Sequence, residues 1–309
     1  MPSKASIPMH TLTNLLASLE DLIANPRYRP LERLGAGGMA EVYLVEHTTL
    51  GRRMALKLMR ENLATRSDAA ELAERMRVEA QAAARLIHPN VVAVTDFWVP
   101  GHGRPCIVME YLQGRTVAER LAAQGRLDVA DAIGHACELA SALDAAHSLG
   151  IVHRDIKPDN LFLDETSRRK PVLKVLDFGV ARILRQESRR TPDPLRSATR
   201  SGAIVGTPYF MSPEAARGQR VDERADIYAV GLCLYMMLIG HGPANFLTLQ
   251  TGPTPEAEPP SKYRPDMPPQ LDGMVLRALR TDRAERHQSA AELLADLRSL
   301  LPRRRSPFA

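Results

Sequence analysis

Two short segments near the middle of the chain carry side chains suited to phosphoryl transfer. The first reads His-Arg-Asp-Ile-Lys-Pro-Asp-Asn at 153–160, and the second is the tripeptide Asp-Phe-Gly at 177–179. Transfer of a phosphoryl group needs a carboxylate to accept the hydroxyl proton and oxygen ligands for the magnesium on the phosphates. Asp155, Asn160 and Asp177 can supply those oxygens. The two segments therefore predict transfer of a phosphoryl group to an alcohol.

A glycine-rich segment lies closer to the N-terminus. Residues 34–42 read Leu-Gly-Ala-Gly-Gly-Met-Ala-Glu-Val, and a strand pattern follows them. A dinucleotide-binding loop opens into a helix and a Walker A loop needs Gly-Lys-Ser/Thr, so neither motif fits. The small side chains at Gly35, Gly37 and Gly38 instead indicate a hairpin whose backbone N–H groups can approach phosphate oxygens. Glycine also serves ordinary tight turns, and that alternative stays open.

A lysine and a glutamate form a second candidate pair. Lys57 ends the strand pattern Met54-Ala55-Leu56-Lys57, whose alternation directs it inward, and Glu79 lies in a helix expected over residues 67–86. A lysine buried in a small lobe is costly unless it is paired, and ATP phosphates and Glu79 are both suitable partners. The alternative is that both side chains are solvated on the surface, where these residue types are usually found.

Strand and helix patterns supply the elements that must position these residues. The strand patterns lie at residues 28–34, 41–46, 53–58, 91–98 and 105–109. The helical patterns lie at residues 67–86, 129–149, 222–239, 271–279 and 289–300. Their order predicts an α+β fold, with a small lobe of five antiparallel strands and one main helix, followed by a larger, mainly helical lobe. Proline-rich residues 253–269 predict an irregular connection.

Changes of pattern near both termini mark segments outside these lobes. Residues 1–27 form an N-terminal extension, in which apolar residues between positions 11 and 24 recur at helical spacing. This amphipathic helix either packs against the rest of the chain or serves for docking or self-association, and the sequence leaves both open. The small lobe is expected over residues 28–111, the large lobe over 112–301, and a basic tail over 302–309.

Composition narrows the class of protein. A length of 309 residues suffices for two lobes, and 44% hydrophobic residues exclude a disordered chain. The net charge of +5 is mild, and no zinc, helix-turn-helix or RNP motif accompanies it, so nucleic-acid binding is not expected. The longest uncharged apolar run, 227–240, is shorter than the ~20 residues of a membrane-spanning helix. The N-terminus carries no secretory signal pattern, so we expect no membrane segment and a cytoplasmic location.

Together these motifs resemble those of the eukaryotic-type, or Hanks-type, serine/threonine protein kinases of bacteria. The resemblance covers about residues 28–301 and extends to Gly-Thr-Pro at 206–208, Ser-Pro-Glu at 212–214 and Asp-Ile-Tyr-Ala-Val-Gly at 226–231. It implies a bilobal protein-kinase-like fold and a kinase that transfers the γ-phosphate of ATP to serine or threonine hydroxyls of proteins. It also implies Mg²⁺ as the metal, with Mn²⁺ as an alternative.

The resemblance implies a role for each matching residue. Asp155 accepts or orients the substrate hydroxyl proton, and Lys157 neutralises charge on the transferring phosphate. Asn160 and Asp177 ligate the metal. Lys57 orients the ATP phosphates and is held by Glu79. The residues expected at the ATP site are Leu34, Gly35, Ala36, Gly37, Gly38, Val42, Ala55, Lys57, Met109, Glu110, Leu112 and Phe162.

Further residues are implied in regulation and support. Thr207 helps to build the acceptor site, and Arg154 senses a phosphate on Thr199 or Ser201 in the activation loop. The alternative for Thr199 and Ser201 is that they are merely solvated. The residues with an implied structural role are Glu214 and Arg286, which form a buried ion pair, and Asp226, which holds the catalytic-loop backbone; His153 and Phe178 are implied to pack in a spine.

Two other functions compete with an active protein kinase. A pseudokinase would bind nucleotide and act as a scaffold without turnover, but Lys57, Asp155 and Asp177 are all present. A small-molecule phosphotransferase would not need the Ser-Pro-Glu segment at 212–214 or the helix that begins near Asp226. The implied partners are protein substrates, which include the chain's own activation loop; a homodimer for trans-autophosphorylation is an open alternative.

Overall fold

The structure, a computed structural model, describes residues 23–37, 40–61, 69–166, 170–178, 210–243 and 257–301. The chain divides into two compact units. Unit 1 comprises Met1–Arg85 and Ala93–Leu112, and unit 2 comprises Leu86–Val92 and Gln113–Ala309. The segment 86–92 had been expected in the small lobe, but Asn90 and Val92 donate hydrogen bonds to the carbonyls of Leu173 and Val175 in unit 2.

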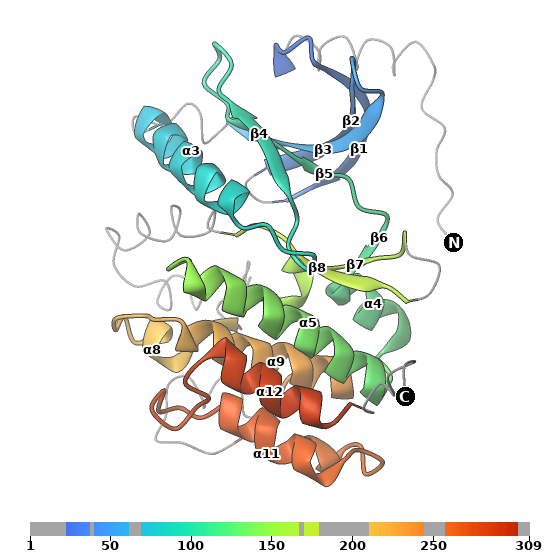
Figure 1. The fold of residues 1–309 in the computed structure, drawn as a ribbon, viewed down its shortest axis with the longest axis vertical. Coiled ribbons are helices and arrows are strands. Elements are labelled where there is room, and N and C mark those ends of the chain that lie inside the picture. Colours follow the sequence, from blue (N-terminus) through green and yellow to red (C-terminus); the bar gives the residue numbers. More distant parts are fainter. Residues whose placement is uncertain are drawn as a thin grey trace, which may run out of the picture. The chain divides into compact units, whose positions relative to one another are not determined.

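Unit 1 is built on a five-stranded antiparallel sheet in the order β1-β2-β3-β5-β4 (Figure 1). The strands are β1 (Tyr28–Ala36), β2 (Ala40–His47), β3 (Arg52–Met59), β4 (Val94–Trp98) and β5 (Cys106–Glu110). All five predicted strands are present, and only the start of β4 differs from its prediction by more than two residues. Residue Val91 was expected in β4 but forms a parallel bridge with Val175 in unit 2.

One face of this sheet forms the hydrophobic core of unit 1. The buried cluster consists of Ile23, Tyr28, Tyr43, Val45, Met54, Leu56, Leu58, Cys106 and Val108. Ile23 belongs to it although it precedes the sheet, and the Trp98 indole N–H donates to its carbonyl at 2.9 Å. The ring of Tyr28 stacks on Trp98 with centroids 5.3 Å apart. Of the predicted N-terminal helix, only this last part lies within the described residues, and Ile23 packs against its own unit.

The main helix in the described part of unit 1 is α3 (Ala69–Arg85), close to its predicted range. Its buried residues Met76, Ala80 and Ala83 are spaced four and three apart, so they lie on one face of the helix. This helix packs against β4 (Figure 1).

Unit 2 contains a second sheet that the sequence patterns had not predicted. Its strands β6 (Gly114–Thr116), β7 (Leu161–Asp164) and β8 (Val172–Val175) pair antiparallel in that order. Gly114 has a φ of 151°, and an added Cβ would lie 2.0 Å from the carbonyl oxygen of Leu163. Only glycine therefore permits this close pairing of β6 with β7.

Helices make up most of the rest of unit 2. They are α4 (Val117–Gln124), α5 (Val129–Ser148), α8 (Pro213–Ala216), α9 (Arg224–Ile239), α11 (Pro269–Ala278) and α12 (Ala290–Ser299), with short 3₁₀ turns η1 (Pro158–Asn160) and η3 (Pro260–Lys262). The predicted helices appear as α5, α9, α11 and α12. The additional helix α4 starts with a capping box in which Thr116 and Glu119 bond each other's backbone N–H groups.

The central helix of unit 2 is α9, which is buried along almost its whole length and packs against α5, α11 and α12 (Figure 1). Gly231 permits the contact with α11, because an added Cβ would lie 2.7 Å from the Ala278 Cβ. Despite its apolar sequence α9 is a core helix. None of the helices in the described part of the chain has the length and apolar character that a membrane crossing requires.

Candidate active site

A buried carboxylate at the start of α9 holds the catalytic-loop segment that the sequence singled out. Asp226, only 1% exposed, accepts hydrogen bonds from the backbone N–H groups of His153 and Arg154, each at 2.8 Å. It accepts a third from the His147 Nε2 at 2.9 Å. Three donors on one carboxylate fix the direction in which the chain enters the loop.

The loop backbone is held in an unfavourable conformation. Arg154 has a φ of 65° and Asp177 a φ of 58°, in the left-handed region that non-glycine residues rarely adopt. Such a conformation costs about 1–2 kcal/mol per residue, so it persists only where surrounding contacts enforce it. For Arg154 the bond from its own N–H to Asp226 is such a contact. Strained residues of this kind cluster at functional sites.

Three of the predicted catalytic side chains meet directly. The Asn160 amide donates to the backbone carbonyl of Asp155 at 2.8 Å and to its carboxylate at 2.9 Å. The Lys157 ammonium lies 2.9 Å from the same carboxylate. Asp155 and Asn160 are both buried, and Lys157 is only partly exposed. The carboxylate of Asp155 is therefore oriented from two sides before any substrate arrives.

The second predicted segment, at 177–179, lies against the first. The buried ring of His153 accepts a hydrogen bond from the Asp155 N–H at its Nδ1 and donates from its Nε2 to the Leu176 carbonyl at 2.9 Å. It also makes an edge contact with the ring of Phe178, with centroids 4.7 Å apart. The Leu176 N–H in turn donates to the Asn160 carbonyl. These bonds bring Asp177 next to the loop that carries Asp155.

In unit 1, strand register gathers several predicted nucleotide-site residues on one face of the sheet. Val42 pairs with Lys57, and Ala55 pairs with Met109. Directly paired residues share a face, and so do residues two apart in a strand such as Ala55 and Lys57. These four side chains therefore lie on the face opposite Leu56 and the other core residues of unit 1.

The glycine-rich hairpin joins β1 and β2 beside that face. Gly35 pairs with Val42, and the Gly37 N–H donates to the Ala40 carbonyl at 2.8 Å. Neither Gly35 nor Gly37 has a positive φ, and an added Cβ would clash with no described atom. Nothing within the described chain therefore requires glycine at these two positions. Leu34 and Ala36, also predicted here, are exposed.

Of the remaining predicted site residues, the structure describes some and leaves others outside the described residues. Glu110 ends β5, where its N–H donates to the Ala93 carbonyl, and Leu112 follows it at the end of unit 1. Phe162 is half-buried on β7 and pairs with Thr116. Glu79 lies in α3, but its side chain is outside the described residues. The predicted sites wholly outside the described residues are Gly38, Thr199, Ser201 and Thr207.

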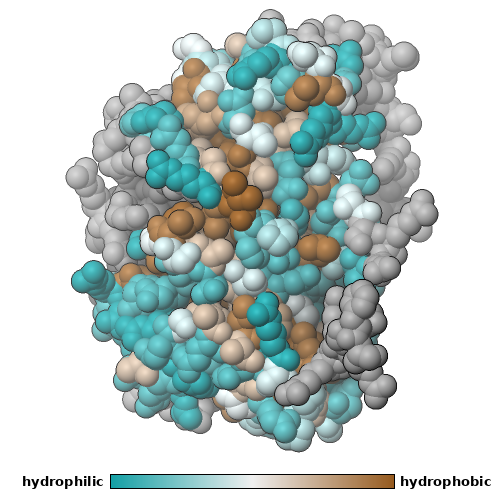
Figure 2. All heavy atoms as spheres, in the orientation of Figure 1, coloured by the Kyte–Doolittle hydropathy of each residue, from teal (hydrophilic) through white to brown (hydrophobic). Residues whose placement is uncertain are grey.

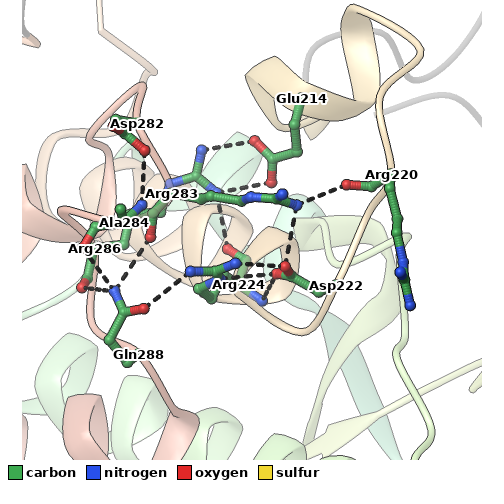
Figure 3. Close-up of polar contacts among 9 residues, drawn as sticks. All are labelled: Glu214, Arg220, Asp222, Arg224, Asp282, Arg283, Ala284, Arg286 and Gln288. Atoms are coloured by element: carbon green, nitrogen blue, oxygen red, sulfur yellow. Dashed lines mark hydrogen bonds and ion pairs between the residues drawn. The ribbon is translucent and has the colours of Figure 1, made fainter.

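The predicted pair of Glu214 and Arg286 forms a bidentate ion pair at 2.9 and 2.8 Å (Figure 3). The Arg286 side chain is fully buried and also donates to the carbonyls of Arg280, Thr281 and Arg224. Burial alone would raise the pKa of Glu214, but the Arg286 guanidinium lowers it below its usual value. The pair joins α8 to the segment that precedes α12.

A second polar cluster, not predicted, flanks this pair. Asp222 accepts from Arg224 at 2.7 and 3.0 Å and from Arg283 at 3.1 Å (Figure 3). Hydrogen bonds from Arg224 are the largest cause that lowers the pKa of Asp222. Gln288 bonds Arg224 and caps the carbonyls of the turn around Arg283. Nearby, the segment after α8 is exposed, and Figure 2 shows mainly hydrophilic side chains at its lower left, where α8 lies in Figure 1.

His147 is the positioning residue that the sequence reasoning missed. It lies in the last turn of α5 and donates to Asp226 from a site 79 positions away in the sequence. Its only local signal was a histidine near the C-terminus of an otherwise apolar helix. A histidine at that position is equally explained by its favourable interaction with the helix dipole, so it did not indicate a buried hydrogen-bond donor.

Comparison with known proteins establishes the family. The family model for the protein kinase domain matches residues 28–296 of this chain, which is most of its length. The chain belongs to the protein kinase family, as the motifs had predicted. The crystal structure of the Mycobacterium tuberculosis PknI kinase domain is similar to this chain with a TM-score of 0.67 at 29% identity, covering 89% of this chain and 96% of that one. This similarity, with the five-stranded antiparallel sheet of unit 1, confirms the predicted fold class.

The curated relatives are bacterial enzymes. Serine/threonine-protein kinase pkn3 of Myxococcus xanthus is 36% identical over 287 residues, which are 90% of this chain and 51% of that protein. Serine/threonine-protein kinase PknB of Mycolicibacterium smegmatis is 39% identical over 278 residues, 88% of this chain and 42% of that protein. The chain thus spans about half the length, or less, of these relatives. The predicted resemblance to bacterial Hanks-type kinases is confirmed.

Proposed function

We propose that this protein is a serine/threonine protein kinase that transfers the γ-phosphate of ATP to hydroxyl groups of proteins, its own activation loop among them. The observation that carries the proposal is the Asp155 carboxylate, held by Asn160 and Lys157 on a loop anchored to Asp226. The relatives pkn3 and PknB, both serine/threonine-protein kinases, support the same activity. The kinase domain would span residues 28–301, with 1–27 and 302–309 as flanking segments.

The catalytic roles follow from the chemistry of the side chains. Asp155 would accept or orient the proton of the attacking hydroxyl, which requires a carboxylate of fixed direction. Lys157, within 2.9 Å of that carboxylate, would neutralise charge on the transferring phosphate. A lysine at this position, together with Thr207, favours serine or threonine over tyrosine as the acceptor.

The donor set fits a magnesium ion held jointly with a nucleotide. Asn160 donates both of its side-chain hydrogen bonds through its amide nitrogen, so its Oδ1 accepts no hydrogen bond from the described residues. Asp177 lies next to Phe178, against the same loop. Within the described residues there is no group of three or more His, Cys, Asp or Glu that could hold a metal alone. Mg²⁺ is commonly bound by one or two protein oxygens plus substrate phosphates, and Mn²⁺ would use the same ligands.

Unit 1 would contribute the nucleotide contacts. The face of its sheet that carries Val42, Ala55, Lys57 and Met109 combines apolar groups for the adenine with a cation for the phosphates. No described residue sterically requires glycine at 35 or 37, which is consistent with a backbone that a ligand approaches closely. Glu79 would hold Lys57, and the backbone groups of residues 110 and 112 would bind the adenine edge.

A phosphate on the activation loop would regulate the kinase activity. Arg154 lies directly before Asp155 and is fixed through its backbone to Asp226. A phosphate on Thr199 or Ser201 would carry about −1.5 to −2 charges and pair with the Arg154 guanidinium, which orders the segment that binds protein substrates. Protein substrates, and a homodimer for phosphorylation in trans, are the proposed partners.

Phosphosite mapping tests the activity. The protein is incubated with ATP and Mg²⁺ and analysed by mass spectrometry beside an Asp155→Asn variant. Asp159→Asn is the matched control, because it removes an exposed carboxylate from the same loop. We expect phosphate on serine or threonine in the parent and in Asp159→Asn, and none in Asp155→Asn or with a chelator. Nucleotide binding without phosphate on the chain or on a generic protein substrate would favour the pseudokinase scaffold instead.

A further inference from the structure

A cavity of about 360 Å³ lies in unit 2, away from the residues assigned to catalysis. Figure 1 shows its surroundings, where the end of α4 leads directly into the start of α5 below β7. The cavity is lined by residues of α4, of the turn that follows it, of the first two turns of α5 and of the segment that enters β8, together with Leu163 of β7 and Arg264 after η3. Its volume lies in the range of about 300–1,000 Å³ found for ligand sites.

The lining of the cavity carries more cations than carboxylates. Its charged groups among the described residues are the cations Arg120, Arg126, Lys170 and Arg264 and the carboxylates Asp128 and Asp131. Four cations against two carboxylates leave a net charge of +2. His135 also lines the cavity, but its ring already contacts Glu138 at 2.9 Å. A partly enclosed space with this balance attracts anions.

Two of the cations, Lys170 and Arg264, already interact with other groups of the chain. The Lys170 ammonium lies 2.8 Å from the Asp131 carboxylate. The buried Arg264 guanidinium donates to the carbonyls of Leu127 and Leu238 at 2.6 and 3.1 Å, which fixes it in place without neutralising its charge. Among the described residues, the exposed Asp266 alone forms an ion pair with it, at 3.4 Å.

The other two cations have donors that no described residue satisfies. The Arg120 Nε is buried and has no hydrogen-bond partner, while its Nη1 lies 3.3 Å from the Glu165 carboxylate. Arg126 makes no hydrogen bond or ion pair with a described residue. A buried N–H without an acceptor is destabilising, so the Arg120 donor calls for an acceptor beyond the described residues.

We propose that this cavity binds a phosphomonoester, held by the guanidinium groups of Arg120 and Arg126. A phosphomonoester carries about −1.5 to −2 charges at neutral pH, which matches the charge of the lining. Its three acceptor oxygens suit the forked N–H groups of arginine, which bind phosphate in a bidentate manner. The phosphate would belong either to a phosphorylated side chain of a protein or to a small metabolite. The chemistry recognised in the cavity is the same in both cases.

Isothermal titration calorimetry on the full chain, without ATP, tests the proposal. The probes are the peptide Ala-phosphoserine-Ala and glycerol 3-phosphate. We expect an Arg120→Gln/Arg126→Gln variant to bind about tenfold or more weakly than the parent, because both charge-assisted contacts are lost. Arg298→Gln, an exposed residue of α12 that does not line the cavity, is the matched control and should retain the parent affinity. Tighter binding of the peptide would identify a protein ligand, and tighter binding of glycerol 3-phosphate a metabolite.

Two outcomes would overturn the proposal. One is the absence of binding heat with either probe at millimolar concentration, as expected if only water fills the cavity. The other is equal affinity of the parent and the double variant, as expected if the phosphate binds at the catalytic loop. Arg126→Gln alone changes only an exposed side chain, so it should fold like the parent. A loss of affinity in this single variant therefore cannot come from a folding defect of the double variant. Because no ATP is present, the result does not depend on whether the chain has kinase activity.

Discussion

Replacement of Arg286 by alanine should destabilise unit 2 more than almost any other single substitution. All five N–H donors of its guanidinium are used: two bond the Glu214 carboxylate and three bond backbone carbonyls. The group also lies over the Tyr228 ring, 5.0 Å from its centroid. Alanine would leave the Glu214 charge buried with no counter-charge.

The magnitude follows from these contacts. Breaking a buried ion pair by removing one partner costs about 3–5 kcal/mol, chiefly because the other charge is left uncompensated. Removal of both charged groups in Glu214→Ala/Arg286→Ala should therefore cost about 2–3 kcal/mol less than the sum of the two single variants. Arg286→Lys keeps the charge but has three donors in place of five, and should lose about 2 kcal/mol.

Urea unfolding followed by circular dichroism measures these differences. Arg283→Ala is the matched control, since Arg283 lies in the same cluster (Figure 3) but its side chain is 37% exposed and bonds the half-buried Asp222. It should cost no more than about 1 kcal/mol. An Arg286→Ala variant within about 1 kcal/mol of the parent, or strictly additive single variants, would refute the reasoning.

Three further predictions concern other parts of the chain. Burial, with a smaller effect of Arg277, lowers the pKa of His287 below its usual 6.5. The unfolded chain therefore binds this proton more readily, and stability should decline as the pH falls below about 6.5; in His287→Gln the urea midpoint should fall less between pH 7 and pH 5. Burial raises the pKa of the Cys106 thiol to about 12 and of the Cys137 thiol to about 11, so neither should react with a disulfide reagent until guanidinium unfolds the chain; rapid reaction of the native protein would contradict their burial. Gly240→Ala should destabilise the protein by more than about 2 kcal/mol in thermal unfolding, because φ of Gly240 is 95° and the new Cβ would lie 2.3 Å from the Gly125 carbonyl oxygen. Gly273 is exposed in a helix, so Gly273→Ala should instead stabilise the protein by about 0.5–1 kcal/mol.

Long elements with a clear period were predictable from the sequence, and short ones held by distant pairing were not. The helix α5 keeps its apolar period for 20 residues and was placed within one residue of its end. The strand β6 has only three residues and pairs with β7, so that Gly114 lies opposite Asp164, fifty positions away in the sequence. No local period marks such a strand. The helix α4 could have been found from its Thr-x-x-Glu capping box.

The same distinction between local spacing and distant pairing applies to the residues of the candidate site. Asp155, Asn160 and Asp177 were predictable because the chemistry needs those types at fixed local spacing. The donor that His147 supplies to Asp226 was not, since burial and hydrogen bonding depend on the packing of α5 against α9. The cationic cavity was equally out of reach, because Arg120 and Arg264 are far apart in the sequence and meet only through the fold.

The most direct test of the account is the rate of phosphate transfer from ATP to a protein substrate by the Asp155→Asn variant. The affinity for ATP is measured in parallel. Asn cannot accept the hydroxyl proton, so the transfer rate should fall by about 10²–10⁴-fold while the ATP affinity stays close to that of the parent. Asp159→Asn should match the parent in both measurements. A transfer rate in Asp155→Asn close to that of the parent would contradict the role assigned to Asp155 and, with it, the proposed mechanism.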